Sequence, residues 1–302
     1  MVDVCLPGTG GMLPLETRYT ASCFIEYMGK AILIDCGEGT QIALKKAGCA
    51  SSRLSILLVT HFHADHIAGL PGLLLTLGNY GKTTPLVIAG PVGLQYVVKA
   101  LMTIAPCLPY PIELKEMDGE GDFNLFDIHV SSMYLKHAIP CLGYRIAIHR
   151  KPIFNPDKAK ELGVPQVLYK TLHAGEAVVL DTGKRIEPSM VIDGERRPIS
   201  ICYITDTVPM MALPRFAYGA DLLVCEGMHG DLNLRENMWE KGHMVFSDSA
   251  ELAQSAKVKE LWLTHFSPSM KSPEQYLGAA ACIFHNTKVG FDGMRTTLLS
   301  DG

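Results

Sequence analysis

A run of metal-ligand side chains, His61-Phe62-His63-Ala64-Asp65-His66, is the part of this sequence best suited to chemistry. It directly follows the apolar segment 54–60, which is short and rich in branched aliphatic residues and therefore predicts a buried strand. Neutral imidazoles and a carboxylate suit Zn²⁺, and the run contains no thiolate. The first two histidines can converge on one ion while the aspartate and the third histidine turn toward a second. An exposed polar turn is the alternative, and this spacing after a strand disfavours it.

Three more candidate ligands lie at the ends of strand-like segments elsewhere in the chain. A two-zinc site needs about four ligands per ion, one of them bridging, so more side chains than the first run are required. His137 precedes an apolar segment, Asp206 follows the strand-like residues 201–205, and His265 follows residues 261–264. For each residue alone, a hydrogen-bonded core or turn position is the simpler interpretation. Together with the histidine run, they predict a metal cluster built at strand ends.

Composition indicates an ordinary globular protein. The chain has 302 residues, of which 48% are hydrophobic and 19% charged, enough for one large α/β domain or two small ones. No segment approaches the ~18 consecutive apolar residues that span a bilayer, and the first residues do not resemble a signal peptide. Nine scattered cysteines without a C-x-x-C pair favour reduced thiols in the cytoplasm. The net charge of −4 gives no global attraction to nucleic acid, so such a partner would need a local basic patch.

Strand-like and helix-like segments alternate along most of the chain, which predicts an α/β fold. Strands are expected at residues 1–6, 22–27, 30–35, 54–60, 126–131, 142–149, 200–204, 221–225 and 261–264. Helices are expected at residues 40–47, 70–77, 93–104 and 272–284. The last helix should open on Ser272 as its cap, with Gln275 completing a capping box. Between about residues 150 and 196 the pattern breaks down into Pro, Lys, Gly and short apolar pieces.

Several motifs resemble the ribonuclease Z family of the metallo-β-lactamase superfamily, whose members process tRNA 3′ ends. The histidine run marks only the superfamily, which includes lactam, thioester, phosphodiester and oxidative chemistries. The segment Asp35-Cys36-Gly37-Glu38-Gly39-Thr40-Gln41 and the pair Gly242-His243 are what point to this branch. The resemblance implies an α/β fold, the metallo-β-lactamase αβ/βα four-layer sandwich, with the site at one edge between two β-sheets. It further implies a single domain over residues 1–302 with an inserted arm at 150–196, hereafter the arm.

The resemblance also implies two zinc ions per chain, each held by residues of the motifs above. One ion would be held by His61, His63 and His137, the other by Asp65, His66 and His265, with Asp206 bridging the two. Manganese is the alternative metal, because histidine and aspartate ligands accept both.

Three residues would carry catalysis by the same resemblance. Asp65 would orient the hydroxide between the metals or take its proton. His243 would donate the proton that the leaving 3′-oxygen needs, and Glu226 would support the charged form of His243. From spacing alone, a surface-turn position is an equally good interpretation of His243 and Glu226.

The segment 145–170 carries six basic and two acidic side chains, which gives it a local net charge of +4. Residues 154–165 within it resemble the flexible arm by which ribonuclease Z holds tRNA. Lysines on such an arm would contact phosphates without reading the base sequence. On charge alone, a solvated surface insertion is an equal alternative. An arm that holds tRNA while another active site cuts it implies a homodimer.

The sequence therefore predicts a cytoplasmic, metal-dependent endoribonuclease that removes the 3′ trailer from tRNA precursors, with no membrane partner. A second hypothesis is a phosphodiesterase for small substrates such as cyclic nucleotides, which would use the same two-metal site without binding RNA. A third is a catalytically silent RNA-binding module. An idle two-metal site would bury charge at a high cost in free energy, and this disfavours the third hypothesis.

Overall fold

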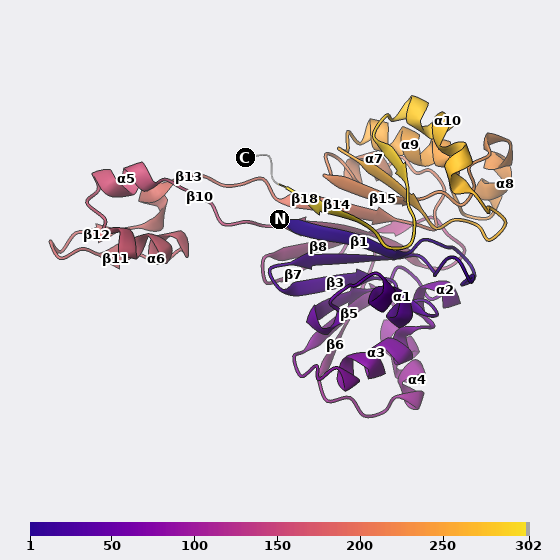
Figure 1. Cartoon of the computed structure of the whole chain (residues 1–302), viewed down its shortest axis with the longest axis horizontal. Coiled ribbons are helices and arrows are strands. Elements are labelled where there is room, and N and C mark those ends of the chain that lie inside the picture. The colour runs from indigo at the N-terminus through magenta and orange to yellow at the C-terminus, as the bar shows by residue number, and fades with distance from the viewer. Residues whose placement is uncertain (300–302) are drawn as a thin grey trace. The chain divides into compact units, whose positions relative to one another are not determined.

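The computed structural model describes residues 1–299, and two seven-stranded β-sheets form its centre (Figure 1). The first sheet has the order β18-β1-β2-β3-β4-β5-β6. Strands β3 to β6 are parallel, and the strands on the other side pair antiparallel. Its strands are β1 (Val2–Gly8), β2 (Ser22–Tyr27), β3 (Lys30–Ile34), β4 (Leu54–Leu58), β5 (Leu86–Pro91), β6 (Ile112–Met117) and β18 (Met294–Leu298).

The second sheet has the order β17-β16-β15-β14-β9-β8-β7, and its strands β14 to β17 are parallel. Parallel strands place their carboxyl ends at one edge of a sheet, where ligands usually bind. Its strands are β7 (Asp122–Leu125), β8 (Ile128–Leu135), β9 (Cys141–Ile148), β14 (Ile199–Ile204), β15 (Leu222–Glu226), β16 (Leu261–Thr264) and β17 (Thr287–Val289).

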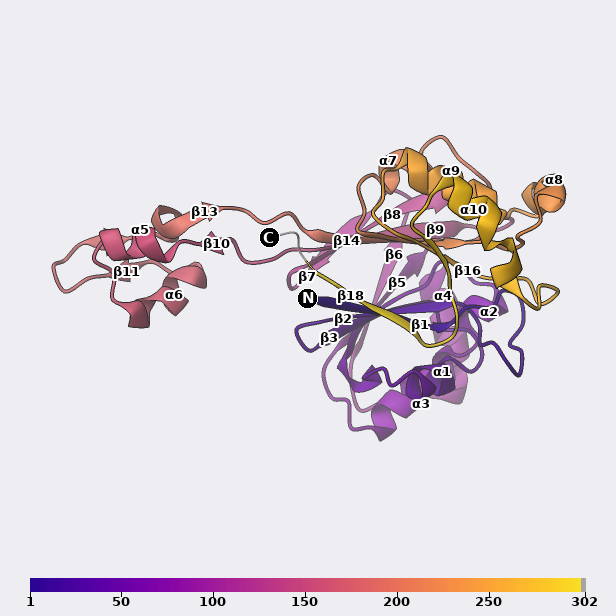
Figure 2. The same ribbon diagram turned by 45° about the horizontal axis from the view of Figure 1, so that its top comes forward.

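Helices cover the outer face of each sheet, which gives four layers (Figure 2). On the first sheet lie α1 (Thr40–Lys46), α3 (Leu70–Asn79) and α4 (Leu94–Leu101). On the second lie α7 (Leu213–Phe216), α9 (Phe246–Ser255) and α10 (Leu277–Ile283). Shorter elements are α2 (Ala64–Ile67), α8 (Arg235–Glu240) and the 3₁₀ turns η1 (Ser51–Arg53), η2 (Met102–Ile104), η5 (Leu232–Leu234) and η6 (Pro273–Tyr276). Within the described residues, no helix is long and apolar enough to cross a membrane.

The central strands are apolar on both faces because both faces are covered. In β4, Leu57 packs into the helix-covered core, while Ile56 and Leu58 on the opposite face are fully buried as well. Strands buried on both sides carry continuous aliphatic runs in place of the alternation of a half-exposed strand. The two sheets are joined where β4 ends, since the Tyr144 hydroxyl donates to the Val59 carbonyl at 2.6 Å. This joint lies two residues before the histidine run and fixes its starting point.

Residues 124–129 and 147–198 form a second, smaller compact unit. Six of its buried apolar residues form one cluster, and the Asn155 side chain caps α5 by accepting from two backbone N–H groups. The elements are β10 (Ile153–Phe154) paired with β13 (Ile192–Gly194), β11 (Val178–Val179) paired with β12 (Arg185–Ile186), α5 (Pro156–Glu161), α6 (Tyr169–His173), η3 (Gln166–Leu168) and η4 (Pro188–Val191). The limits of the arm at 150 and 196 stay a prediction.

The expected capping box at Ser272 is wrong. Its side chain makes no capping hydrogen bond, and the N–H of Gln275 is instead directed to the Ser272 backbone carbonyl at 3.3 Å. That bond closes the 3₁₀ turn η6, and the α-helix begins only at Leu277. A serine followed by proline therefore opens a tight turn here, which the sequence pattern does not distinguish from a helix start.

Candidate metal centre

Ligand-type side chains gather where strands of both sheets end. The His61–His66 run follows β4, while His137, Asp206 and His265 follow β8, β14 and β16. Asp206 and His265 each have a φ of 59°, in the left-handed region. For a residue other than glycine this conformation costs on the order of 1–3 kcal/mol, and the surrounding structure must hold it in place. Both residues turn sharply out of their strands, toward the histidine run.

One group of ligand atoms is formed by His61, His63 and His137, whose atoms lie within 4.8 Å of one another. His61 Nε2 lies 2.9 Å from His63 Nδ1, and His137 Nε2 lies 3.3 Å from the same nitrogen. Two nitrogens bound to one zinc ion at ~2.0–2.1 Å in tetrahedral geometry are about 3.3 Å apart. The spacing is therefore that of ligands around a common ion.

A second group is formed by Asp65, His66 and His265, again within 4.8 Å. Nε2 of His66 lies 3.2 Å from Nε2 of His265, and Asp65 Oδ2 lies 3.3 and 3.5 Å from these two nitrogens. The backbone fixes the same carboxylate oxygen, because the N–H of Met12 donates to Asp65 Oδ2 at 2.6 Å. Burial would raise the pKa of Asp65, but hydrogen bonds from the two histidines hold it well below its usual range.

Asp206 lies between the two groups and directs one oxygen to each. Oδ1 is 3.9 Å from Nε2 of both His61 and His137, and Oδ2 is 3.4 and 3.5 Å from His66 and His265. The side chain is buried, and Oδ2 has no hydrogen-bond partner among the described residues. Burial alone would raise its pKa, yet the surrounding histidines hold the pKa of Asp206 well below the usual value.

These residues fit divalent metal ions. A buried carboxylate oxygen without a hydrogen bond and imidazole nitrogens facing one another are unfavourable unless a proton or a cation lies between them. The donor set is nitrogen and oxygen only, which suits zinc and also manganese. The arrangement would hold one ion in each group, with Asp206 reaching both.

A layer of hydrogen bonds behind the ligands orients two of the imidazoles. Thr60 Oγ1 lies 3.0 Å from both oxygens of Asp35 and 3.0 Å from His61 Nδ1. The Asp35 carboxylate in turn lies 2.8 Å from His66 Nδ1. Such contacts fix the ring tautomer, so that Nε2 of His61 and of His66 stays free for a metal. No sequence pattern assigned Thr60 and Asp35 this role, although Asp35 stands after a strand as Asp206 does.

Two glycines allow the ligands to approach the backbone. A Cβ added at Gly11 would lie 2.8 Å from the His265 ring, and one at Gly242 would lie 2.8 Å from His137 Nδ1. Gly242 also has a φ of 81°, and its carbonyl is 3.2 Å from His137 Nδ1. The packing role of Gly11 follows from a contact between distant parts of the chain.

His243 and Glu226 form a buried pair beside the ligand groups. His243 Nδ1 lies 2.9 Å from Glu226 Oε2, and the second carboxylate oxygen accepts from the backbone N–H of Thr207 at 2.7 Å. Burial disfavours the charged imidazole, but the Glu226 carboxylate outweighs it and raises the pKa of His243 to about 9. Since Nδ1 is directed to Glu226, Nε2 is the nitrogen left to face a substrate. The two residues thus lie within the site and not in surface turns.

The remaining histidines have other surroundings. His229 Nδ1 accepts from the backbone N–H of Asp231 at 3.0 Å, and its ring packs against Tyr276. His173 Nε2 lies 3.1 Å from the Pro152 carbonyl. Among the described residues, neither belongs to a group with metal-ligand spacing.

The basic side chains of the segment 145–170 are of two kinds, paired within the protein or exposed. Arg145 belongs to β9, and its guanidinium donates to the carbonyls of Phe216 and Tyr218 at 2.9 and 3.1 Å, so its charge is used within the sheet. Lys160 and Lys170 are exposed. Only the second kind is available to a polyanion.

Comparison with known proteins finds a matching family and curated relatives of this chain. The family described as Anti-Pycsar protein Apyc1 matches residues 2–172. A curated relative from Clostridium acetobutylicum named Ribonuclease Z is 44% identical over 97% of this chain and 96% of its own length. Another of that name, from Agathobacter rectalis, is 43% identical over 100% of this chain and 99% of its own.

Solved structures show the same fold. Human tRNase Z, short form, aligns with a TM-score of 0.67 at 24% identity, covering 98% of both chains. The metallo-beta-lactamase fold protein YhfI from Bacillus subtilis aligns with a TM-score of 0.69 at 17% identity, also covering 98% of both chains. The expected metallo-β-lactamase sandwich is therefore confirmed.

Proposed function

The chain belongs to the ribonuclease Z family, and through residues 2–172 also to the family described as Anti-Pycsar protein Apyc1; on that premise we propose that it is a metal-dependent endoribonuclease that removes 3′ trailers from tRNA precursors. The observation that carries this proposal is the position of Asp206 between two ligand groups, beside the pair of His243 and Glu226. Two metal positions and a separate proton donor suit the metal-assisted hydrolysis of an RNA phosphodiester.

The metal site in this proposal holds two zinc ions per chain. One would be held by His61, His63 and His137, the other by Asp65, His66 and His265, with Asp206 within reach of both groups. Bound there, divalent ions would lower the pKa of water and stabilise the negative charge that grows on the phosphoryl oxygens. The chain's own contribution is to hold these six side chains and the Asp206 carboxylate in one arrangement, with Thr60 and Asp35 fixing the rings of His61 and His66.

His243 is the proposed proton donor. The bond between phosphorus and the 3′-oxygen breaks, and this oxygen takes the proton from His243 Nε2, which leaves the imidazole neutral. Glu226 keeps His243 charged before the step and holds the ring through Nδ1. Asp65, held by the Met12 N–H, orients the attacking water or accepts its proton.

The remaining parts of the proposal concern assembly and location. Residues 150–196 act as an arm that holds the body of the tRNA through exposed lysines, within an otherwise single domain of residues 1–302. An arm that holds the substrate far from its 3′ end is best served by a second copy of the chain, so we propose a homodimer. A cytoplasmic location is supported by the cysteines, since all nine are free thiols.

The test is cleavage of a 3′-extended tRNA precursor by the zinc-loaded protein, with Asp65→Ala alongside. We expect one cut at the 3′ end of the acceptor stem, absent in the variant. No cut by a preparation that contains two metals per chain would overturn tRNA processing. Turnover of a cyclic mononucleotide in the same preparation would then establish the small-substrate phosphodiesterase in its place.

A further inference from the structure

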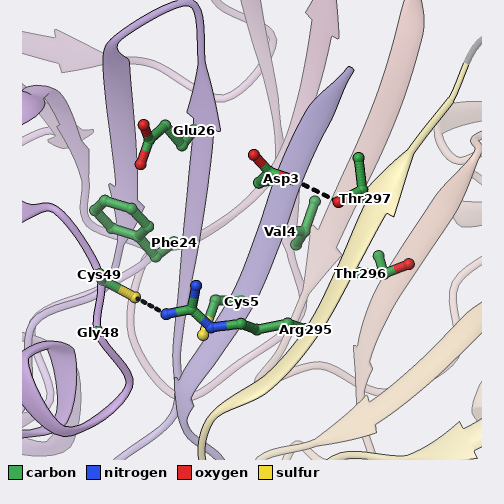
Figure 3. A pocket seen from close by; sticks show the side chains of 10 residues that line it. All are labelled: Asp3, Val4, Cys5, Phe24, Glu26, Gly48, Cys49, Arg295, Thr296 and Thr297. Atoms are coloured by element: carbon green, nitrogen blue, oxygen red, sulfur yellow. Dashed lines mark hydrogen bonds between the residues drawn. The ribbon is translucent and has the colours of Figure 1, made fainter.

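A cavity of about 410 Å³ opens on the face of the first sheet where β18, β1 and β2 lie side by side (Figure 3). Its lining includes two cysteines and a guanidinium, contributed by Cys5 in β1, by Cys49 after α1, and by Arg295 in β18. In the described part of the chain, neither thiol belongs to the ligand groups of the metal centre. The cavity therefore brings together nucleophilic side chains that the proposed reaction does not use.

Both cysteines lie beside the same arginine. Cys5 is in register with Arg295 across the β1–β18 pair, and the Arg295 guanidinium donates from Nη2 to Cys49 Sγ at 3.6 Å. Both cysteines line the same cavity and belong to one apolar cluster. Cys5 is only 3% exposed, whereas Cys49 is partly exposed at the cavity wall. Cys49 is thus the accessible sulfur, and Cys5 is its buried neighbour.

The electrostatic surroundings distinguish the two sulfurs further. Interaction with the Cys5 side chain and the charge of Arg295 lower the pKa of Cys49, against burial and the charge of Glu26. Interaction with the Cys49 side chain and burial raise the pKa of Cys5 far above its usual value. A thiol with a lowered pKa and partial exposure is the one that reacts with oxidants, and an adjacent thiol resolves the product.

We propose that Cys49 and Cys5 form a reversible disulfide, with Cys49 as the sulfur that peroxide oxidises and Cys5 as the resolving thiol. The Cys49 thiolate attacks one oxygen of hydrogen peroxide, the O–O bond breaks, and hydroxide leaves, which gives the sulfenic acid. Cys5 then attacks the Cys49 sulfur, the S–O bond breaks, and the departing hydroxide takes the proton of the Cys5 thiol. Two thiols and one peroxide thus give one disulfide and two waters, and a dithiol reductant reverses the reaction.

The cavity is large enough to admit the oxidant. A water molecule occupies about 30 Å³ of liquid, and hydrogen peroxide is less than twice that size, so a 410 Å³ cavity holds it easily. The disulfide would join the end of α1 to β1, two elements that already pack together. Cys5 and Arg295 lie on strands of the first sheet, and Cys49 follows α1.

The experiment is peroxide titration of the full chain carrying Cys107→Ser and Cys282→Ser, which removes the two exposed thiols. We expect the intact mass to fall by two hydrogens, and digestion without reductant to give one linked peptide pair that contains Cys5 and Cys49. Dithiothreitol should restore the original mass. In Cys5→Ser, oxidation should stop at a Cys49 sulfenic acid that dimedone traps, and Arg295→Met should slow that trapping several-fold.

The proposal is overturned if Cys49 stays reduced at peroxide concentrations that convert free cysteine completely. It is equally overturned if the linked peptides join other cysteines, such as Cys5 with its neighbour Cys23. The mass and peptide map of the parent protein decide the question even where a cysteine variant does not fold.

Discussion

The metal centre and the arm are built on opposite principles. The centre collects ligand side chains from the ends of four strands and a helix start, buries most of them, and orients the His61 and His66 rings through Thr60 and Asp35. The arm has an apolar cluster of six buried residues, strands of two or three residues, and exposed lysines. Bond cleavage needs atoms placed within tenths of an ångström, whereas phosphate contact needs only charge within reach. We therefore expect substitutions in the centre to affect the chemical step, and those in the arm to affect substrate binding.

The largest effect is expected at Asp206. Asp206→Asn keeps the shape but removes the charge that both ligand groups share, so kcat on precursor tRNA should fall by about 10³-fold, several kcal/mol of transition-state stabilisation. Metal content, measured by inductively coupled plasma spectrometry, should fall from two per chain. The matched control is Asp193→Asn in the arm, whose exposed carboxylate pairs with Lys158 at 2.8 Å and should leave kcat unchanged. Equal losses in both variants would remove the distinction between the regions.

His243→Ala should separate proton donation from metal chemistry. On RNA, whose 3′-oxygen leaves poorly without a proton, kcat should fall by roughly 10²–10⁴-fold. On bis(p-nitrophenyl) phosphate, whose phenolate leaves unprotonated, the loss should be less than about tenfold. His229→Ala serves as the control and should behave as the parent does on both substrates. A similar loss on both esters would assign His243 to metal binding instead.

Asp35→Asn should weaken metal binding without removing a ligand. The amide no longer holds the His66 ring by a charged acceptor, and loss of such supporting contacts typically lowers metal affinity by about 10–100-fold. Competition with a chromophoric chelator measures this directly. Thr60→Val should show a smaller change in the same direction, and unchanged affinity in both variants would mean that the rings need no such support.

In the arm, Lys160→Ala with Lys170→Ala should raise KM for precursor tRNA and leave kcat on the small ester unchanged. Each lost phosphate contact should reduce the slope of log affinity against log salt by about 1. Lys45→Ala with Lys99→Ala, two basic residues of helices on the first sheet, provides a charge-matched control. A salt slope that changes equally in both pairs would show general charge and no binding by the arm.

The smallest effect is expected at Asn155, which caps α5. Asn155→Ala should cost about 1 kcal/mol within the arm and increase amide hydrogen exchange in residues 156–173. Hydrolysis of the small ester should not change. Faster exchange around β4 in this variant would show that the loss of stability is not confined to the arm.

The sequence predicts the centre better than it predicts what supports it. The His61–His66 run is local, and strand ends identify His137, Asp206 and His265 because ligands in such sheets follow strands. Thr60 and Gly11 act through contacts between distant segments, and residue spacing carries no information on these. The sequence also does not reveal what a charged side chain contacts. Arg145 counts as basic in the sequence, but its guanidinium donates to two backbone carbonyls.

The elements of the fold also differ in how well the sequence predicts them. Aliphatic strands such as β4 and β14 are predicted because burial on both faces demands their composition. Serine is a residue type that often caps helices, yet the Ser272 side chain makes no capping hydrogen bond. Its backbone carbonyl instead accepts the hydrogen bond from the N–H of Gln275. Patterns of burial are thus more reliable here than patterns of individual polar side chains.

The measurement that tests this account most directly compares two substrates in a variant whose residues 150–196 are replaced by a short Gly-Ser linker. We predict that kcat/KM for precursor tRNA falls by at least about 10²-fold while hydrolysis of bis(p-nitrophenyl) phosphate stays within about twofold of the parent, since the loss is in phosphate contacts alone. The retained ester activity also demonstrates that the metal centre is folded. Undiminished cleavage of precursor tRNA by this variant would contradict the division between a cutting centre and a binding arm.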